Sequence, residues 1–129
     1  ARLGAAYGDL PAHDGLWQAA QDTADNLLAR LAVVPLVLEA RGLDVTPAMI
    51  DSLKKAGDED SVVVLNVIYR DEIRHVAVGR KWFEYFCIGE LEQTWRDLVA
   101  QHFRGALKPP FNDKARSEAG FGMGYYGET

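Results

Sequence analysis

The pentapeptide Asp71-Glu72-Ile73-Arg74-His75 holds the residues best suited to metal chemistry. Glu72 and His75 are three positions apart, so on a helix their side chains lie on one face. A metal ion there would take an oxygen from Glu72 and a nitrogen from His75. This spacing also arises by chance, so a metal site requires a helix that buries the pair and further carboxylates beside it.

Glu39 is the predicted partner of this pair. Apolar residues recur at spacings of three and four over residues 14–41, which predicts a long amphipathic helix that starts after Asp14. Glu39 lies on its apolar stripe, where a carboxylate is costly unless it is paired or bound to metal. Pro35 predicts a kink one turn before Glu39. The alternative is that Glu39, at the helix end, reaches water or pairs with Arg41.

A second long helix is predicted over residues 60–88, and it carries Glu72 and His75 within its buried stripe. Val62, Val63 and Val64 favour a strand by propensity, but the helical period continues through them. Gly79 lies one turn after His75 on the same face. A glycine there is unfavourable for the helix, so it predicts close packing against a neighbour or access to the site.

The remaining elements are predicted to be short helices. Gly42 is expected to end the first long helix, and Thr46-Pro47 to begin a short helix to about residue 56. Amphipathic patterns predict further helices over residues 91–104 and 112–119, the second capped by Asn112. Residues 120–129 have no period and are expected to form a loosely held tail. The predicted fold is one all-α domain over residues 1–129, with two long antiparallel helices and several short ones.

Composition argues against several classes of protein. The net charge is −5 and the 14 Lys and Arg residues form no run, which argues against binding to nucleic acid or an anionic membrane. Cys87 is single, and no apolar run is long enough to span a bilayer, so the reducing cytoplasm is the expected location. No phosphate-binding glycine loop or Gly-x-Ser-x-Gly motif occurs. His13 and His102 are assigned capping or structural roles.

Oxygen donors with imidazole favour iron, or manganese as the alternative, over zinc. Bundles that hold two such metals use four carboxylates and two imidazoles. This chain supplies Glu39, Glu72 and His75, which is half of that set. The other half is expected from a preceding segment of a longer protein, as the start at Ala1 without Met suggests, or from a second copy of the chain about a two-fold axis.

Several motifs, in order, carry a resemblance to a known family. They are YGDLPAHDGLW at 7–17, LEARGLD at 38–44, DEIRHV at 71–76 with WF at 82–83, and KPPFN at 108–112. Together they resemble the bacterial ferritin-like family of unknown function, which is similar to the di-iron tRNA hydroxylases. The resemblance implies that this chain is the C-terminal half of a ferritin-like bundle.

The same resemblance assigns roles to the candidate residues. Glu39 matches the bridging or terminal carboxylate of the third bundle helix, and Glu72 with His75 matches the Glu-x-x-His of the fourth. Asp71 and Arg74 fit the Asp-Glu-x-Arg-His form, in which the aspartate accepts a hydrogen bond from the metal-bound histidine.

The function expected from these features is that of a di-iron oxidoreductase using O2 or peroxide, with its catalytic residues unassigned. Apolar side chains are expected to keep water from the metals; they are Leu65, Ile68 and Phe83. One alternative is a helical dimerisation or scaffold module without metal, in which Glu72 pairs with Arg70, Arg74 or a partner chain. Another is metal storage or peroxide detoxification with the same ligands.

Overall fold

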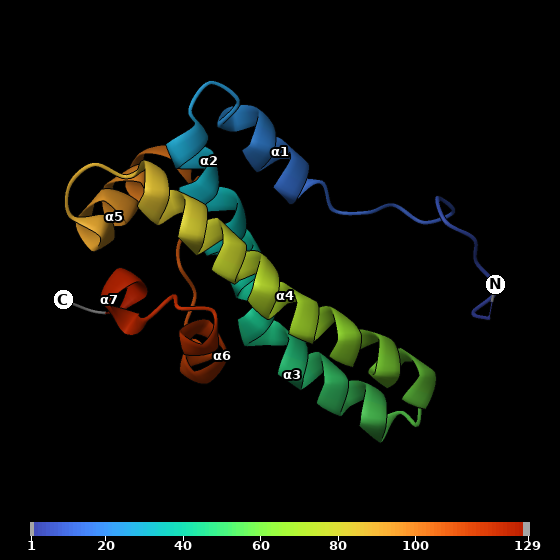
Figure 1. The fold of residues 1–129 in the computed structure, drawn as a ribbon. Helices are drawn as coiled ribbons and strands as arrows, with labels where there is room; N and C mark the ends of the chain where they lie inside the picture. Colours follow the sequence, from blue (N-terminus) through green and yellow to red (C-terminus); the bar gives the residue numbers. More distant parts are fainter. Residues whose placement is uncertain (1, 128–129) are drawn as a thin grey trace.

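The computed structural model describes residues 2–127, and over this range it is all-helical, which confirms the predicted fold class. The helices are α1 (Gly15–Asp22), α2 (Leu27–Val33), the π-helix η1 (Val34–Glu39), α3 (Ala40–Lys55), α4 (Glu59–Phe86), α5 (Leu91–His102), α6 (Asp113–Glu118) and α7 (Met123–Tyr126). Figure 1 shows α3 running beside α4, while α5, α6 and α7 gather near the other end of α4. None of the described helices is long and apolar enough to cross a membrane.

The central feature is a helical hairpin. Its first arm consists of α2, η1 and α3, which follow one another without a break, and its second arm is α4. The Asn26 side chain accepts a hydrogen bond from the Ala29 amide at 2.9 Å and so caps α2. Asp58 caps α4 in the same way through the Ser61 amide at 3.2 Å. The predicted second long helix is confirmed, since α4 has 28 residues and includes the three valines.

The prediction of one continuous helix over residues 14–41 is wrong. The chain breaks between α1 and α2, where the Thr23 hydroxyl donates to the Ala19 carbonyl at 2.7 Å and Asn26 begins the next helix. Short polar side chains of this kind compete with helical backbone hydrogen bonds. Trp17 lies in α1, before this break, and it is 66% exposed.

Pro35 produces a π-helix. A proline cannot donate the hydrogen bond of its helical turn, and the chain is widened over Val34–Glu39, with Pro35 in its first turn. Single π-helical turns of this kind occur often at functional sites. Here the π-helix ends on Glu39.

The predicted helix end at Gly42 is also wrong. Helix α3 runs through Gly42 and contains Pro47 in its interior. Because Pro47 has no N–H, it cannot bond the carbonyl of Leu43 one turn earlier. The Asn112 side-chain amide donates to that carbonyl at 3.0 Å. Asn112, which lies 69 positions after Leu43 in the sequence, thus provides the hydrogen bond that Pro47 cannot.

The C-terminal segment over residues 120–127 is packed on the core, so the prediction of a loose tail is wrong for these residues. Phe121 is fully buried, and Tyr125 and Tyr126 are 6% and 7% exposed. The rings of Phe121 and Tyr125 lie 5.4 and 6.0 Å from that of Trp95 in α5. Helix α7 has four residues, too few for a helical period to appear in the sequence. Residues 128–129 of the predicted tail lie outside the described residues.

The core lies where α5 and the C-terminal segment pack on the hairpin. Its largest fully buried side chains include Trp95, Phe83, Phe121, Leu36 and Leu43. The Trp95 indole donates to the Ala32 carbonyl at 3.1 Å, which ties α5 to the end of α2. Phe83 is buried as predicted. Together these contacts pack α5 and the C-terminal segment against the end of the hairpin that contains η1.

Candidate metal centre

Glu39, Glu72 and His75 come together in the structure. Each offers one ligand atom, and these atoms lie within 4.8 Å of one another. Glu39 is the last residue of η1, and Glu72 and His75 lie in the middle of α4. The two arms of the hairpin thus bring two carboxylates and one imidazole to one point, as the sequence predicted. Their role as metal ligands stays a prediction.

Two glycines set how closely the arms approach around this cluster. A Cβ on Gly79 would lie 2.4 Å from Pro35 Cβ and 2.6 Å from Pro35 Cγ, so the proline ring occupies the space that a side chain would need. A Cβ on Gly42 would lie 3.9 Å from Glu72 Oε2, an ordinary contact. The structure confirms that Gly79 serves close packing, one turn from His75.

The two carboxylates are only partly compensated. His75 Nδ1 lies 3.1 Å from Glu72 Oε1. Burial raises the pKa of Glu39, the charge of Glu72 raises it further, and His75 partly opposes the rise. Within residues 2–127, no charged nitrogen of a Lys or Arg side chain lies within 4.0 Å of either carboxylate. A site with this excess of negative charge favours the binding of a proton or a metal cation.

The other sequence candidates lie outside the cluster. Asp71 and Arg74 are exposed, and His75 Nδ1 faces Glu72, so the predicted support of His75 by Asp71 stays a prediction. His13 Nδ1 accepts a hydrogen bond from the Gly15 amide at 3.1 Å, which confirms its capping role at α1. His102 ends α5.

Sequence reasoning missed a buried ion pair. The carboxylate of Asp44 accepts two hydrogen bonds from Arg116, at 2.9 and 2.7 Å, and the two side chains are 1% and 4% exposed. The guanidinium lies 4.3 Å from the ring centre of Tyr126 and 4.7 Å from that of Phe111. The partners are 72 positions apart, so no local pattern could reveal the pair.

One side of the cluster is open. The His75 side chain is 56% exposed, and apolar side chains on neighbouring positions of α4 are also exposed. They are Val64, Val67, Ile68, Val78, Trp82 and Phe86, called here the open face of α4. Ile68 is 44% and Phe86 45% exposed, and the prediction that His75 lies in the buried stripe of this helix is wrong for the chain alone.

Comparison with known proteins places the chain in a family. An uncharacterized protein of Haemophilus influenzae is 40% identical over 129 residues, a match that covers 92% of this chain and 42% of that protein. The chain therefore spans less than half the length of the curated relative. No solved structure matches. Residues 1–127 match the family described as "Protein of unknown function (DUF455)", and the chain belongs to this family.

Proposed function

We propose that this protein is a ferritin-like di-metal carboxylate oxidoreductase that uses O2 or peroxide, with Glu39, Glu72 and His75 as half of its metal site. The observation that carries the proposal is the convergence of their ligand atoms within 4.8 Å, from two antiparallel helices. Oxygen and imidazole donors suit iron, and manganese as the alternative. Two bound iron ions would supply the electrons for the reduction of O2 or peroxide.

The raised pKa of Glu39 is consistent with a cation site. Burial and the neighbouring carboxylate make the charged form of Glu39 unfavourable in the metal-free protein, and a divalent cation would remove this penalty. Glu72 would share the cation, and its contact with His75 keeps the imidazole on the same side of α4. Buried Val76 and Phe83 on α4 limit the access of water from within the hairpin.

The second half of the site would come from another pair of helices on the open face of α4. This face places exposed apolar side chains beside the exposed imidazole of His75. A large exposed apolar surface is typical of an interaction site. The additional helices would belong to further polypeptide of a longer protein, as the length of the relative allows, or to a second copy of this chain.

A metal-binding experiment tests the proposal. The protein is loaded with Fe(II) without oxygen, and bound iron is measured for the parent chain and for Glu72→Gln and His75→Gln. Glu118→Gln is the matched control, because Glu118 is an exposed carboxylate of α6. We expect iron in the parent and the control, and its loss from the two site variants. Equal iron in all four proteins, or no iron in the parent together with unchanged stability of Glu72→Ala, would contradict the proposal.

Measurements of substrate turnover and of the mass of the protein in solution distinguish the remaining alternatives. Oxidation of added substrates by O2 or peroxide supports an oxidoreductase, whereas iron uptake without a substrate product supports storage or detoxification. The mass in solution, measured together with iron per chain, distinguishes a two-fold site from one completed by a longer polypeptide. The alternative of a scaffold without metal requires a cationic side chain beside Glu72. The exposed Arg70 side chain instead donates a hydrogen bond to the carbonyl of Asn66 at 3.4 Å, which does not favour this alternative.

A further inference from the structure

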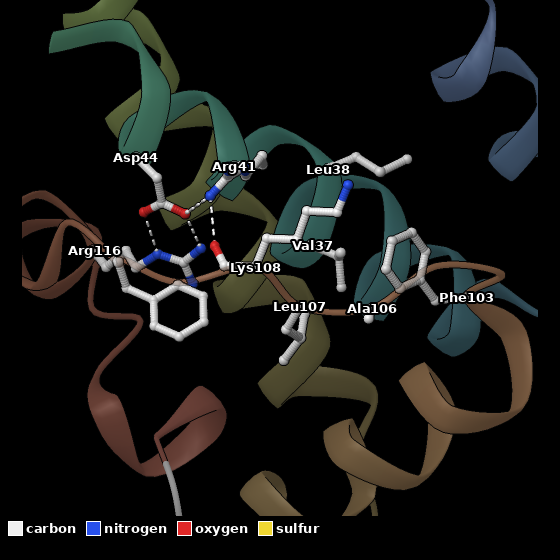
Figure 2. Close-up of a pocket in the computed structure, with 10 residues that line it drawn as sticks. Val37, Leu38, Arg41, Asp44, Phe103, Ala106, Leu107, Lys108 and Arg116 are labelled. Atoms are coloured by element: carbon white, nitrogen blue, oxygen red, sulfur yellow. Dashed lines mark hydrogen bonds and ion pairs between the residues drawn. The ribbon is translucent and has the colours of Figure 1, made fainter. Parts of the chain in front are cut away.

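A second site candidate is a cavity of about 180 Å³ between the first arm of the hairpin and the loop that follows α5. Its apolar lining includes Val37, Leu38, Phe103, Leu107 and Phe111. Charged side chains complete the wall where α3 begins and where the loop passes it (Figure 2). The KPPFN motif, for which the metal site has no use, contributes Lys108 and Phe111 to this cavity.

Most of the charge on one side of the cavity is already neutralised. Asp44 and Arg116 form the buried ion pair described above, and the backbone amide of Asn112 donates to Asp44 at 2.8 Å. Arg116 is also enclosed by the rings of Phe111 and Tyr126. This pair forms a wall of the cavity, and its two charges already neutralise each other.

Arg41 and Lys108 supply positive charge that is not neutralised in this way. Arg41 Nη1 donates to the Lys108 carbonyl at 2.6 Å and lies 3.7 Å from the shared carboxylate of Asp44. Figure 2 shows the Lys108 side chain extending along η1 toward Leu38. Within residues 2–127, no carboxylate lies within 4.0 Å of the Lys108 amino group. The cavity therefore combines an apolar wall with a cationic edge.

We propose that this cavity binds a small organic monocarboxylate with a compact apolar body, of about the size of benzoate. An apolar cavity of about 150 Å³ holds one benzene molecule, so 180 Å³ suits a single ring or a short branched chain. The ligand carboxylate accepts hydrogen bonds from the Lys108 amino group and from guanidinium N–H groups of Arg41. The ring contacts Leu38, Leu107 and Phe103.

The site is separate from the candidate metal centre. Leu38 precedes Glu39 in η1, and neighbouring residues of a helix project their side chains in different directions. Leu38 lines the cavity while Glu39 faces α4. The proposal therefore does not depend on metal binding, and it can be tested on the chain without metal.

Titration of the chain with benzoate, followed by amide NMR shifts, tests the proposal. We expect saturable shifts in the loop over residues 103–111 and roughly tenfold weaker binding of benzamide, which has the same ring without the charge. Lys108→Gln should weaken benzoate binding severalfold, and Lys108→Arg should restore it. Lys54→Gln, at the exposed end of α3, removes the same charge elsewhere and should leave binding unchanged.

Any one of the following results would overturn the proposal. The first is the absence of saturable shifts with benzoate in a parent chain whose amide spectrum is that of a folded protein. The second is equal binding of benzoate and benzamide, or equal weakening by Lys108→Gln and Lys54→Gln. The third is competition by inorganic phosphate at the same concentration as benzoate, because an anion that binds without the ring would require only the cationic edge.

Discussion

The contact between Gly79 and Pro35 leads to a sharp prediction about the hairpin. A Cβ on Gly79 would lie 2.4 Å from Pro35 Cβ, whereas favourable carbon contacts begin at about 3.5 Å. Gly79→Ala therefore requires η1 and α4 to separate by roughly 1 Å, because the proline ring cannot rotate away. Glu39 lies one turn after Pro35, so the same movement would draw it away from Glu72.

The expected magnitude follows from two opposing effects. Replacing a glycine by alanine inside a helix stabilises it by about 1 kcal/mol. Overpacking a well-packed contact costs about 1–3 kcal/mol. We expect the second effect to dominate for Gly79→Ala, with a net loss of up to about 2 kcal/mol in the free energy of unfolding.

Gly42→Ala is the matched control for this prediction. Gly42 also lies inside a helix of the hairpin, but a Cβ there would be 3.9 Å from Glu72 Oε2 and would fit. Gly42→Ala should therefore gain about 1 kcal/mol. The difference between the two variants isolates the cost of the contact, about 1–3 kcal/mol, or roughly 3–5 °C per kcal/mol in Tm.

Urea denaturation of the metal-free parent and both variants, with a thermal melt for each, measures this difference. The expected order of stability is Gly42→Ala, parent, Gly79→Ala. If Gly79→Ala were as stable as Gly42→Ala, Pro35 would not restrict the approach of the helices. The proposed role of Gly79 in holding the cluster together would then be wrong.

Three further predictions concern charge and burial. Burial and a neighbouring carboxylate raise the pKa of Glu39, so its contribution to stability is present below the pKa of the unfolded chain and is lost as pH rises through the folded pKa. Metal-free Glu39→Gln should therefore lose less stability than the parent between pH 4 and pH 7 (about the range of a perturbed carboxyl), and equal losses in urea titrations would contradict this. Asp44→Asn leaves the buried Arg116 charge without its partner and should cost about 3–5 kcal/mol in urea denaturation; a loss below about 1 kcal/mol would refute that pairing. Phe121→Ala should cost about 3–5 kcal/mol in the same assay, because its ring is fully buried. An effect near zero would mean that the C-terminal segment is loosely held in solution, as the sequence predicted.

The features that follow a local pattern were predictable from the sequence. The period of α4 fixes the face that carries Glu72 and His75, and spacing alone puts both residues on that face. The cap of α6 by Asn112 is equally local, because its side chain accepts a hydrogen bond from the Ala115 amide three residues later. Hydrophobic period and capping depend on neighbours within a few residues, so the sequence shows them directly.

Other features depend on contacts between distant residues. Pro47 can lie inside α3 because Asn112 bonds the freed carbonyl of Leu43, and Phe121 is buried because Trp95 lies against it. No local pattern encodes these contacts, and local rules therefore misplaced a helix end and a tail.

The metal-centre candidate combines both kinds of information. The sequence by itself identified Glu39, Glu72 and His75 by donor type and spacing. Only the tertiary structure decided that they meet, because their distance depends on the approach of two helices at Gly79 and Pro35. The pKa shift of Glu39 likewise arises from burial and from a charge 33 positions away, across the hairpin. Such long-range geometry has no period, and packing alone determines it.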